Sequence, residues 1–154
     1  MHVTDILTAD AVKVIGACSS KKRLFHDLGQ LAETCFGIKA TTVIDALIDR
    51  EGLGPTGVGH GVALPHARIA EMEKVCGVFL KLEKPLNFDS VDRQPVDLVF
   101  CLFAPASAGV DHLKALALVS RTMRDADIRA KLRANGDPGT LYTILTSSEA
   151  SKAA

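Results

Sequence analysis

The sequence is poor in aromatic residues and has no excess of charge of either sign. Aromatic side chains make up 5% of the 154 residues and apolar residues 47%, so a core must consist mainly of Leu, Val, Ile and Ala. The 18 basic residues balance 18 acidic ones. A neutral chain gives no overall electrostatic reason to bind nucleic acid or an anionic membrane, which argues against both classes of partner. The length corresponds to one domain.

Closely spaced cysteine pairs and long apolar runs are also missing. The four cysteines are Cys18, Cys35, Cys76 and Cys101; they form no C-x-x-C pair, and the last three lie in apolar stretches. This pattern predicts small buried side chains in a reducing compartment, rather than disulfides or a zinc site. The longest uncharged stretch, residues 98–110, is broken by Pro105 and is shorter than the ~20 residues of a membrane span. The N-terminus lacks the basic region and apolar run of a signal peptide, so we expect a soluble cytoplasmic protein.

Apolar residues at helical spacing predict helices in the first and last thirds of the chain. Two are expected in the first third: one that begins at Ser19 or Ser20 and ends at Gly37, and one from residue 41 or 42 to about 51. Three more are expected to begin at Ser107 or Asp111, at Asp125, and at Asp137–Pro138.

The middle of the chain has the pattern of strands. Residues 75–82 and 96–103 are short and apolar, and the second segment is typical of a central strand covered on both faces. Residues 54–68, GPTGVGHGVALPHAR, combine glycines with apolar residues at the period of a strand, which predicts a tight hairpin or a glycine-bulged strand that ends at Pro65. Helices on either side of a run of strands predict a single α/β domain, with one sheet covered by helices on both faces.

Of the five histidines, His66 has the most distinctive surroundings. It follows Pro65, which fixes the local backbone, and a glycine-rich stretch that lets an anion or another protein approach closely. Neutral imidazole is nucleophilic, and a phosphoryl group on its nitrogen can be passed on again because imidazole is a good leaving group. Spacing alone also fits an ordinary turn histidine with a satisfied hydrogen bond.

Two other side chains have chemistry that would assist such a transfer. His112 lies near the start of a predicted helix, where free N–H groups and the helix dipole favour an anion. Arg50, at the end of the second predicted helix, offers a planar fork to phosphate oxygens. Each also fits a structural role, His112 as a first-turn residue and Arg50 as a cation at a helix C-terminus.

Other classes of site are not supported by the spacing. His60, His66 and His112 show neither H-x-x-x-H nor H-E-x-x-H spacing, which argues against a metal site. The sequence has no G-x-S-x-G turn of a serine hydrolase and no G-K-[ST] of a P-loop. We therefore expect neither a metal nor another cofactor.

The segment TGVGHGVALPHAR resembles the active-site motif of the IIA proteins of the bacterial phosphoenolpyruvate-dependent phosphotransferase system. It is similar in particular to the fructose/mannitol branch, which includes the nitrogen-regulatory IIA proteins. The pattern there is T-G-[IV]-G-N-G-[IV]-A-[IV]-P-H, followed by a small residue and often a base. Further similarity lies in LEKPLNFDSVDRQPVDLVFCLFAP and DHLKALALVSRTMRD, so the resemblance extends roughly from Ile6 to Leu145. It implies an α/β sandwich around a mixed sheet, with a domain over residues 1–148 and a frayed tail at 149–154.

The resemblance also implies roles for individual residues. His66 matches the phosphorylated histidine of the motif, and His112 matches the second active-site histidine. Arg50 matches a basic residue that lies near the phosphoryl site in relatives. The chain departs from the pattern at His60, where the family commonly has asparagine. We expect a structural replacement there, with an effect on His66 titration or a minor phosphorylation site as alternatives.

The implied activity is that of a phosphocarrier. A phosphohistidine on an HPr-like carrier protein would dock over an apolar collar that includes Val62 and Leu64. His66 would then attack the phosphorus through Nε2, while His112 and Arg50 stabilise the charge on the transferring group. No metal or nucleotide is needed, because the donor is already activated.

The sequence says less about which proteins such a carrier would act on. Nothing resembling a IIB cysteine site or a membrane domain follows the IIA-like segment, which favours a regulator whose phosphorylation state controls target proteins. Related proteins act on potassium transport, sensor kinases and nitrogen or carbon control. The alternatives are a fructose- or mannitol-specific IIA protein that passes phosphate to a separate IIB partner, and a non-catalytic binding module with the same fold.

Overall fold

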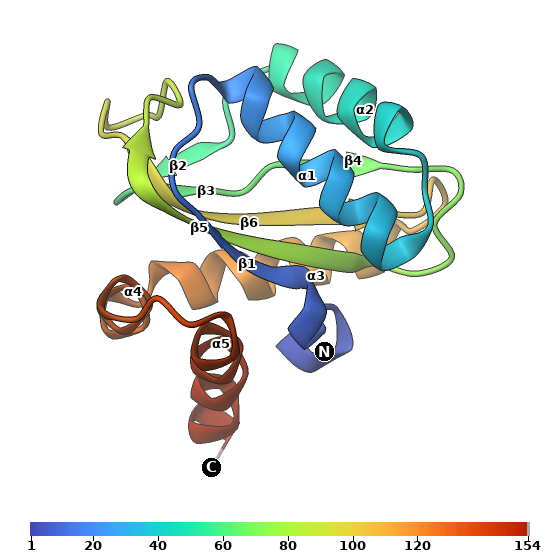
Figure 1. Cartoon of the computed structure of the whole chain (residues 1–154). Helices are drawn as coiled ribbons and strands as arrows, with labels where there is room; N and C mark the ends of the chain where they lie inside the picture. The colour runs from blue at the N-terminus through green and yellow to red at the C-terminus, as the bar shows by residue number, and fades with distance from the viewer. Residues whose placement is uncertain (154) are drawn as a thin grey trace.

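A six-stranded mixed sheet forms the centre of the computed structural model, which describes the backbone of residues 1–153 and the side chains of residues 1–147. The strand order is β1-β5-β6-β3-β2, and β4 also pairs with β6 (Figure 1). The strands are β1 (Val12–Ile15), β2 (Gly57–Gly59), β3 (Val62–Ala63), β4 (His66–Arg68), β5 (Cys76–Leu86) and β6 (Val96–Ala104).

The antiparallel pair of β5 and β6 lies in the middle of this sheet. On its other edge β6 pairs in parallel with β3 and β4, so the strand has neighbours on both sides. Nearly all of its residues are buried, as predicted from its apolar composition. Phe79 of β5 and Phe100 of β6 meet edge to face with ring centroids 6.0 Å apart, so the few aromatic residues are concentrated in the core.

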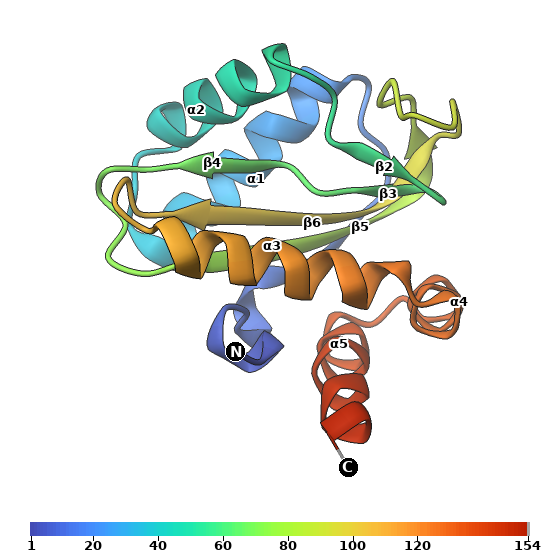
Figure 2. The same ribbon diagram turned by 180° about the vertical axis from the view of Figure 1, so that it is seen from behind.

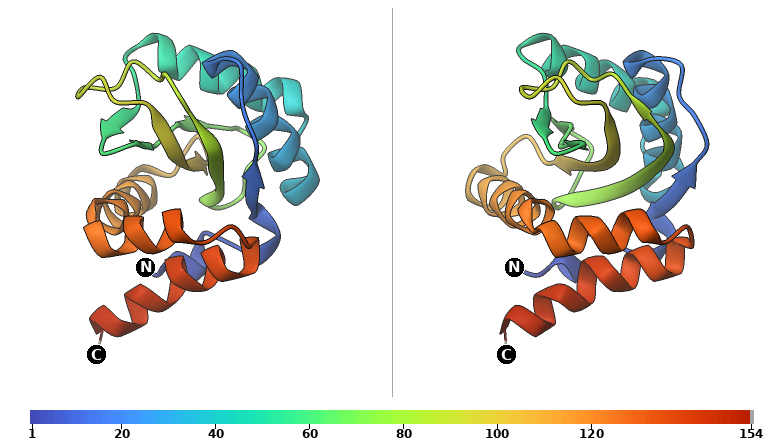
Figure 3. Two further views of the ribbon diagram at one scale, coloured as in Figure 1. Left: turned by 60° about the vertical axis from the view of Figure 1, so that its left-hand side comes forward. Right: turned by 90° about the vertical axis from the view of Figure 1, so that its left-hand side faces the viewer.

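Helices cover both faces of the sheet, which confirms the predicted single α/β domain with a mixed sheet. Helices α1 (Lys21–Phe36) and α2 (Ala40–Gly52) lie on one face, and α3 (Gly109–Arg124) lies on the other (Figures 1 and 2). Helices α4 (Ala126–Ala134) and α5 (Pro138–Ala153) follow α3, and α5 packs against β1 and the N-terminal 3-10 turns η1 (Val3–Asp5) and η2 (Ala9–Ala11) (Figure 3).

Side-chain caps define several helix ends as the sequence predicts. The Ser20 hydroxyl accepts from Arg23 N–H at the start of α1, and Gly37 ends that helix with a left-handed φ of 73°. The Asp125 carboxylate accepts the free N–H groups at the start of α4, and Asp137 accepts from Thr140 N–H at the start of α5.

Two features of the local structure differ from those predicted from the sequence: an additional strand and the start of a helix. The short strand β1 was not predicted, because four residues give too little alternation to identify a strand whose partner, β5, is distant in sequence. Helix α3 begins at Gly109 after Ala108 and has no side-chain cap, so neither Ser107 nor Asp111 starts it. Asp111 instead lies within the first turn, where a carboxylate faces the positive end of the helix dipole.

The predicted C-terminal tail, residues 149–154, lies outside the residues whose side chains the structure describes. The cysteines are thiols, and Cys76 and Cys101 are buried as predicted, whereas Cys18 and Cys35 are partly exposed. Burial, followed by a hydrogen bond to Asp27, raises the pKa of Cys18 to about 11, so this thiol is not ionised near neutral pH. Within the described part of the chain, no helix has both the length and the apolar character needed to cross a membrane.

Candidate functional site

The segment that contains His66 is one strand interrupted in its middle. Val62 of β3 pairs with Leu98, and His66 of β4 pairs with Leu102, so both pieces keep the same register along β6. Between them the Pro65 carbonyl accepts from Leu102 N–H at 3.0 Å. The predicted end of the strand at Pro65 corresponds to the break between β3 and β4, and the chain resumes pairing with β6 at His66. This pairing fixes the backbone of His66 on the central strand.

Both ring nitrogens of His66 have hydrogen-bond partners that define its tautomer. Nδ1 lies 3.0 Å from the Leu64 carbonyl oxygen, which can only accept, so Nδ1 carries the hydrogen. Nε2 lies 3.2 Å from Nε of Arg50, which can only donate, so Nε2 carries the lone pair. His66 is thus a neutral imidazole with its nucleophilic nitrogen directed toward a guanidinium.

Arg50 reaches His66 from the last turn of α2. Its Nη1 donates to the Gly54 carbonyl at 3.0 Å, while its Nε bonds His66. The first of these bonds holds the guanidinium beside the turn that leads into β2. A planar cation held in this way can exchange its bond to Nε2 for bonds to anionic oxygens attached to Nε2.

The ring of His112 lies edge to face with the ring of His66, with centroids 5.7 Å apart and planes at 69°. It comes from the first turns of α3, on the opposite face of the sheet from α2. His112 is only 6% exposed, and its Nε2 is buried with no hydrogen-bond partner among the described residues. Burial first, and then the electrostatic influence of the neighbouring His66 and of Arg68, lower the pKa of His112 below its ordinary value of 6.5. With its hydrogen on the unpaired Nε2, the neutral imidazole of His112 can donate to an anion that arrives beside it.

Arg68 is a member of this cluster that we did not predict as a site residue. It lies two residues after His66 in β4, and the alternation of a strand places both side chains on the same face. Its Nη1 donates to the Ala106 carbonyl at 3.1 Å, in the turn before α3. Two features of the sequence could have identified Arg68: the two-residue alternation of a strand, and the basic residue that often follows the histidine in the motif.

His60 lies at the tip of the hairpin formed by β2 and β3, and the predicted hairpin is confirmed. His60 and Gly61 have φ of 57° and 75°, as a tight turn of two residues requires. The His60 N–H donates to Asp92 at 2.9 Å, and its carbonyl accepts from Arg133 at 2.5 Å. His60 precedes β3 and His66 begins β4, and these two strands follow one another along β6 (Figure 2). Six residues of extended chain at ~3.3 Å each separate His60 from His66 by about 20 Å. This distance favours a structural role for His60.

The predicted apolar collar is not where we expected it. Val62 and Leu64 are buried in the core, so they cannot contact a partner. Exposed apolar side chains instead lie beside the other site residues: Leu53, which is 85% exposed, at the end of α2, and Val110 and Leu113 on either side of His112 in sequence. The alternation of residues in the sequence placed Val62 and Leu64 on one face of a strand. It could not show whether that face lies in the core or on the surface.

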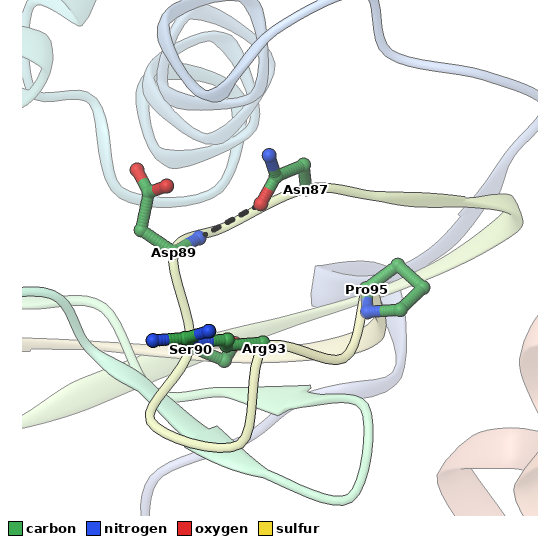
Figure 4. A pocket seen from close by; sticks show the side chains of 5 residues that line it. All are labelled: Asn87, Asp89, Ser90, Arg93 and Pro95. Carbon is green, nitrogen blue, oxygen red and sulfur yellow. Dashed lines mark hydrogen bonds between the residues drawn. The ribbon is translucent and has the colours of Figure 1, made fainter.

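A cleft of about 480 Å³ lies away from these residues, on the loop between β5 and β6. Asn87, Asp89, Ser90, Arg93 and Pro95 line it, and the Asn87 side chain accepts from Asp89 N–H (Figure 4). None of the predicted site residues takes part in it. This cleft is therefore separate from the histidine cluster.

The family described as "Phosphoenolpyruvate-dependent sugar phosphotransferase system, EIIA 2" matches residues 5–148. The chain belongs to this family. Membership makes it a component of a phosphoenolpyruvate-dependent phosphotransferase system, and the resemblance predicted from the histidine motif is confirmed.

Individual relatives show how close the similarity to known proteins is. A nitrogen regulatory protein of Bradyrhizobium diazoefficiens is 44% identical, with 94% of this chain and 95% of the relative covered. A fructose-specific EIIA component of Haloferax volcanii is 32% identical, with 94% and 97% covered. The crystal structure of the nitrogen regulatory protein IIA-Ntr from Neisseria meningitidis has a TM-score of 0.86 at 34% identity, with 94% of this chain and 99% of that chain covered.

Proposed function

We propose that the chain is a phosphocarrier that accepts a phosphoryl group on Nε2 of His66 from an HPr-like phosphohistidine protein. We propose further that its phosphorylation state regulates target proteins. The observation that carries the proposal is the Nδ1–H tautomer of His66, with the Nε2 lone pair beside Arg50. The carrier would act in the cytoplasm, where its donor would be found, and would need neither a metal nor a nucleotide.

The transfer is an in-line substitution at phosphorus. The lone pair of His66 Nε2 forms the new N–P bond, while the N–P bond of the donor breaks and its electron pair returns to the donor imidazole. If the second nitrogen of the donor ring is protonated, the donor leaves as neutral imidazole. The Nδ1 proton of His66 stays on its nitrogen, where the Leu64 carbonyl stabilises the positive charge that the ring gains.

The surrounding groups stabilise the charge on the phosphoryl oxygens. Arg50 releases Nε2 and donates to those oxygens, and Arg68 adds positive charge from the same strand. The unpaired Nε2 of His112 is a further donor when the neutral ring carries its hydrogen on that nitrogen. Preorganised donors of this type stabilise phosphoryl transfer mainly by electrostatics.

The exposed apolar residues Leu53, Val110 and Leu113 form the surface over which the donor docks. A phosphoryl group with close to two negative charges in the middle of this surface disfavours partners that bind the neutral form. The same charge creates a contact for partners with a basic patch. A regulator therefore needs no large conformational change to exchange one target for another.

A regulatory role is favoured by the nitrogen regulatory relatives, which include the 44% identical protein of Bradyrhizobium. Components of potassium transport and sensor kinases are the targets that we propose to test first. A fructose- or mannitol-specific IIA function with a separate IIB partner is the second candidate, supported by the fructose-specific relative of Haloferax. A non-catalytic binding module is the outcome if no phosphoryl group is accepted.

The test is transfer of labelled phosphate from phosphoenolpyruvate through purified enzyme I-type and HPr-type proteins. Wild type is expected to be labelled and His66→Ala to remain unlabelled. His26→Ala, which removes an exposed histidine of α1, is the matched control and should be labelled like wild type. An unlabelled wild type, or a labelled His66→Ala protein, overturns the proposal. Onward passage to sugar when IIB and IIC proteins are added identifies the transporter function instead.

A further inference from the structure

Glu51 is a nearly buried carboxylate next to Arg50 in sequence, but it does not touch His66. Its side chain is 8% exposed. Oε2 accepts from Thr56 N–H at 2.9 Å and from the Lys21 ammonium at 2.9 Å, and Oε1 accepts from the Thr56 hydroxyl at 2.6 Å. Burying a charged group is costly unless it is paired and hydrogen-bonded, and these bonds meet that requirement.

The contacts of Glu51 continue through the hairpin to His66. Thr56 precedes β2, and its carbonyl accepts from Leu64 N–H at 2.9 Å. The Leu64 carbonyl in turn accepts from Nδ1–H of His66 at 3.0 Å. Leu64 therefore has its N–H fixed by Thr56 and its C=O directed at the imidazole. Displacement of Thr56 would move the carbonyl that selects the tautomer.

The chemistry of Thr56 explains why a carboxylate is needed at position 51. Thr56 presents two donors in the same direction, its N–H and its hydroxyl, and a carboxylate supplies two acceptor oxygens. An amide would supply only one acceptor and would direct an NH₂ group at the second donor. Lys21 compensates the charge from α1, while its ammonium also lies 4.4 Å above the Phe88 ring.

We propose that Glu51 is a positioning residue that holds His66 in the Nδ1–H tautomer through Thr56 and the Leu64 carbonyl. The inference rests on the proposed role of His66 as phosphoacceptor, because only that tautomer leaves the Nε2 lone pair free. The last turn of α2 then acts on both ring nitrogens: Arg50 contacts Nε2 directly, and Glu51 orients the group that binds Nδ1.

The direct test is the tautomer of His66, measured from the ring ¹⁵N resonances of the full chain labelled in histidine. Wild type is expected to show the hydrogen on Nδ1. Glu51→Gln and Thr56→Val are expected to shift His66 toward the Nε2–H form or an exchanging mixture. Glu33→Gln is the matched control, because Glu33 also accepts a backbone N–H, that of Ala40 at the other end of α2. It should leave the His66 resonances unchanged.

The functional test is the rate of phosphorylation by the phosphorylated HPr-type donor. A misplaced hydrogen-bond acceptor changes the rate by roughly five- to tenfold, so Glu51→Gln and Thr56→Val should be slower by about that factor at saturating donor. The donor concentration for half-maximal rate should not change, because the Glu51 side chain is only 8% exposed and its carboxylate is bonded to Thr56 and Lys21. Thr56→Val keeps the backbone bond to Glu51, and it tests the inference alone if Glu51→Gln does not fold.

The outcomes separate this inference from the proposed function. If folded Glu51 and Thr56 variants keep the wild-type tautomer and rate, the positioning role is wrong while labelling of His66 still stands. If wild type already shows the hydrogen on Nε2, the positioning role is also wrong. If His66→Ala accepts label, the proposed function fails whatever the tautomer of His66.

Discussion

Replacement of Arg50 by lysine is expected to slow phosphoryl transfer to His66 without abolishing it. In the unphosphorylated protein the guanidinium donates through Nε to His66 and through Nη1 to the Gly54 carbonyl. Lysine keeps the charge but lacks the planar fork, so it cannot bond a phosphoryl oxygen while it remains anchored at Gly54 in the same way.

Two opposing effects set the size of the change. The bond from Arg50 to Nε2 is long, at 3.2 Å, and must break before the nitrogen attacks, so its loss favours the reaction by about 1 kcal/mol. The bonds that Arg50 then makes to anionic oxygens are charge-assisted and contribute about 2–3 kcal/mol. If all of these bonds are lost, the second effect is larger by about 1–2 kcal/mol, so the rate of Arg50→Lys should fall by at most about 5- to 30-fold.

The assay is single-turnover transfer from the isolated phosphorylated HPr-type donor, followed by rapid quench. Arg23→Lys, on the exposed surface of α1, is the matched control and should transfer at the wild-type rate. Arg50→Ala should be slower than Arg50→Lys, because it loses the charge as well. An Arg50→Lys protein that transfers as fast as wild type, or faster, would show that Arg50 only shields the nucleophile and would refute the reasoning.

Three further predictions concern neighbouring features. Because the pKa of His112 is lowered in the folded state, the unfolded chain binds an additional proton as the pH falls through 6.5. The free energy of unfolding, measured by urea titration, should therefore decrease as the pH falls below 6.5, and it should decrease less steeply in His112→Gln. An equal pH dependence in the two proteins would contradict the lowered pKa of His112. His60→Asn should leave His66 labelling unchanged, and a slower rate would mean that the hairpin tip acts on the site. A Cβ at Gly29 would lie 2.6 Å from Cγ1 of Ile44, so Gly29→Ala should cost about 1–3 kcal/mol in urea unfolding, whereas Gly52→Ala, with open space around it, should not.

The parts of the fold that depend on local chemistry could be predicted from the sequence. Ser20, Asp125 and Asp137 each satisfy N–H groups within a few residues, so their caps are visible in the chain itself. The strand β1 could not be recognised, because only its pairing with β5 and its burial against α5 make it a strand. The start of α3 has no side-chain cap, and so no local signal for it existed.

The candidate site shows the same division between local and long-range information. The motif identified His66, and its resemblance identified His112 and Arg50, which the fold brings together from β4, α3 and α2. The contacts that give the cluster its chemistry are long-range and could not be predicted. Which nitrogen of His66 faces Arg50, and how Glu51 reaches it through Thr56, depend on how the end of α2 packs beside β4.

The unpaired Nε2 of His112 affects how long a phosphoryl group would stay on the chain. A buried nitrogen without a partner costs about 1–3 kcal/mol, and an anion that arrives beside it relieves this cost. Every contact that stabilises bound phosphate lowers the tendency to donate it, by about tenfold for each 1.4 kcal/mol. In the phosphocarrier that we propose, this contact would slow the onward transfer of the phosphoryl group from His66. The phosphorylated fraction would then follow the supply of phosphate averaged over time, as a sensor of metabolic state requires.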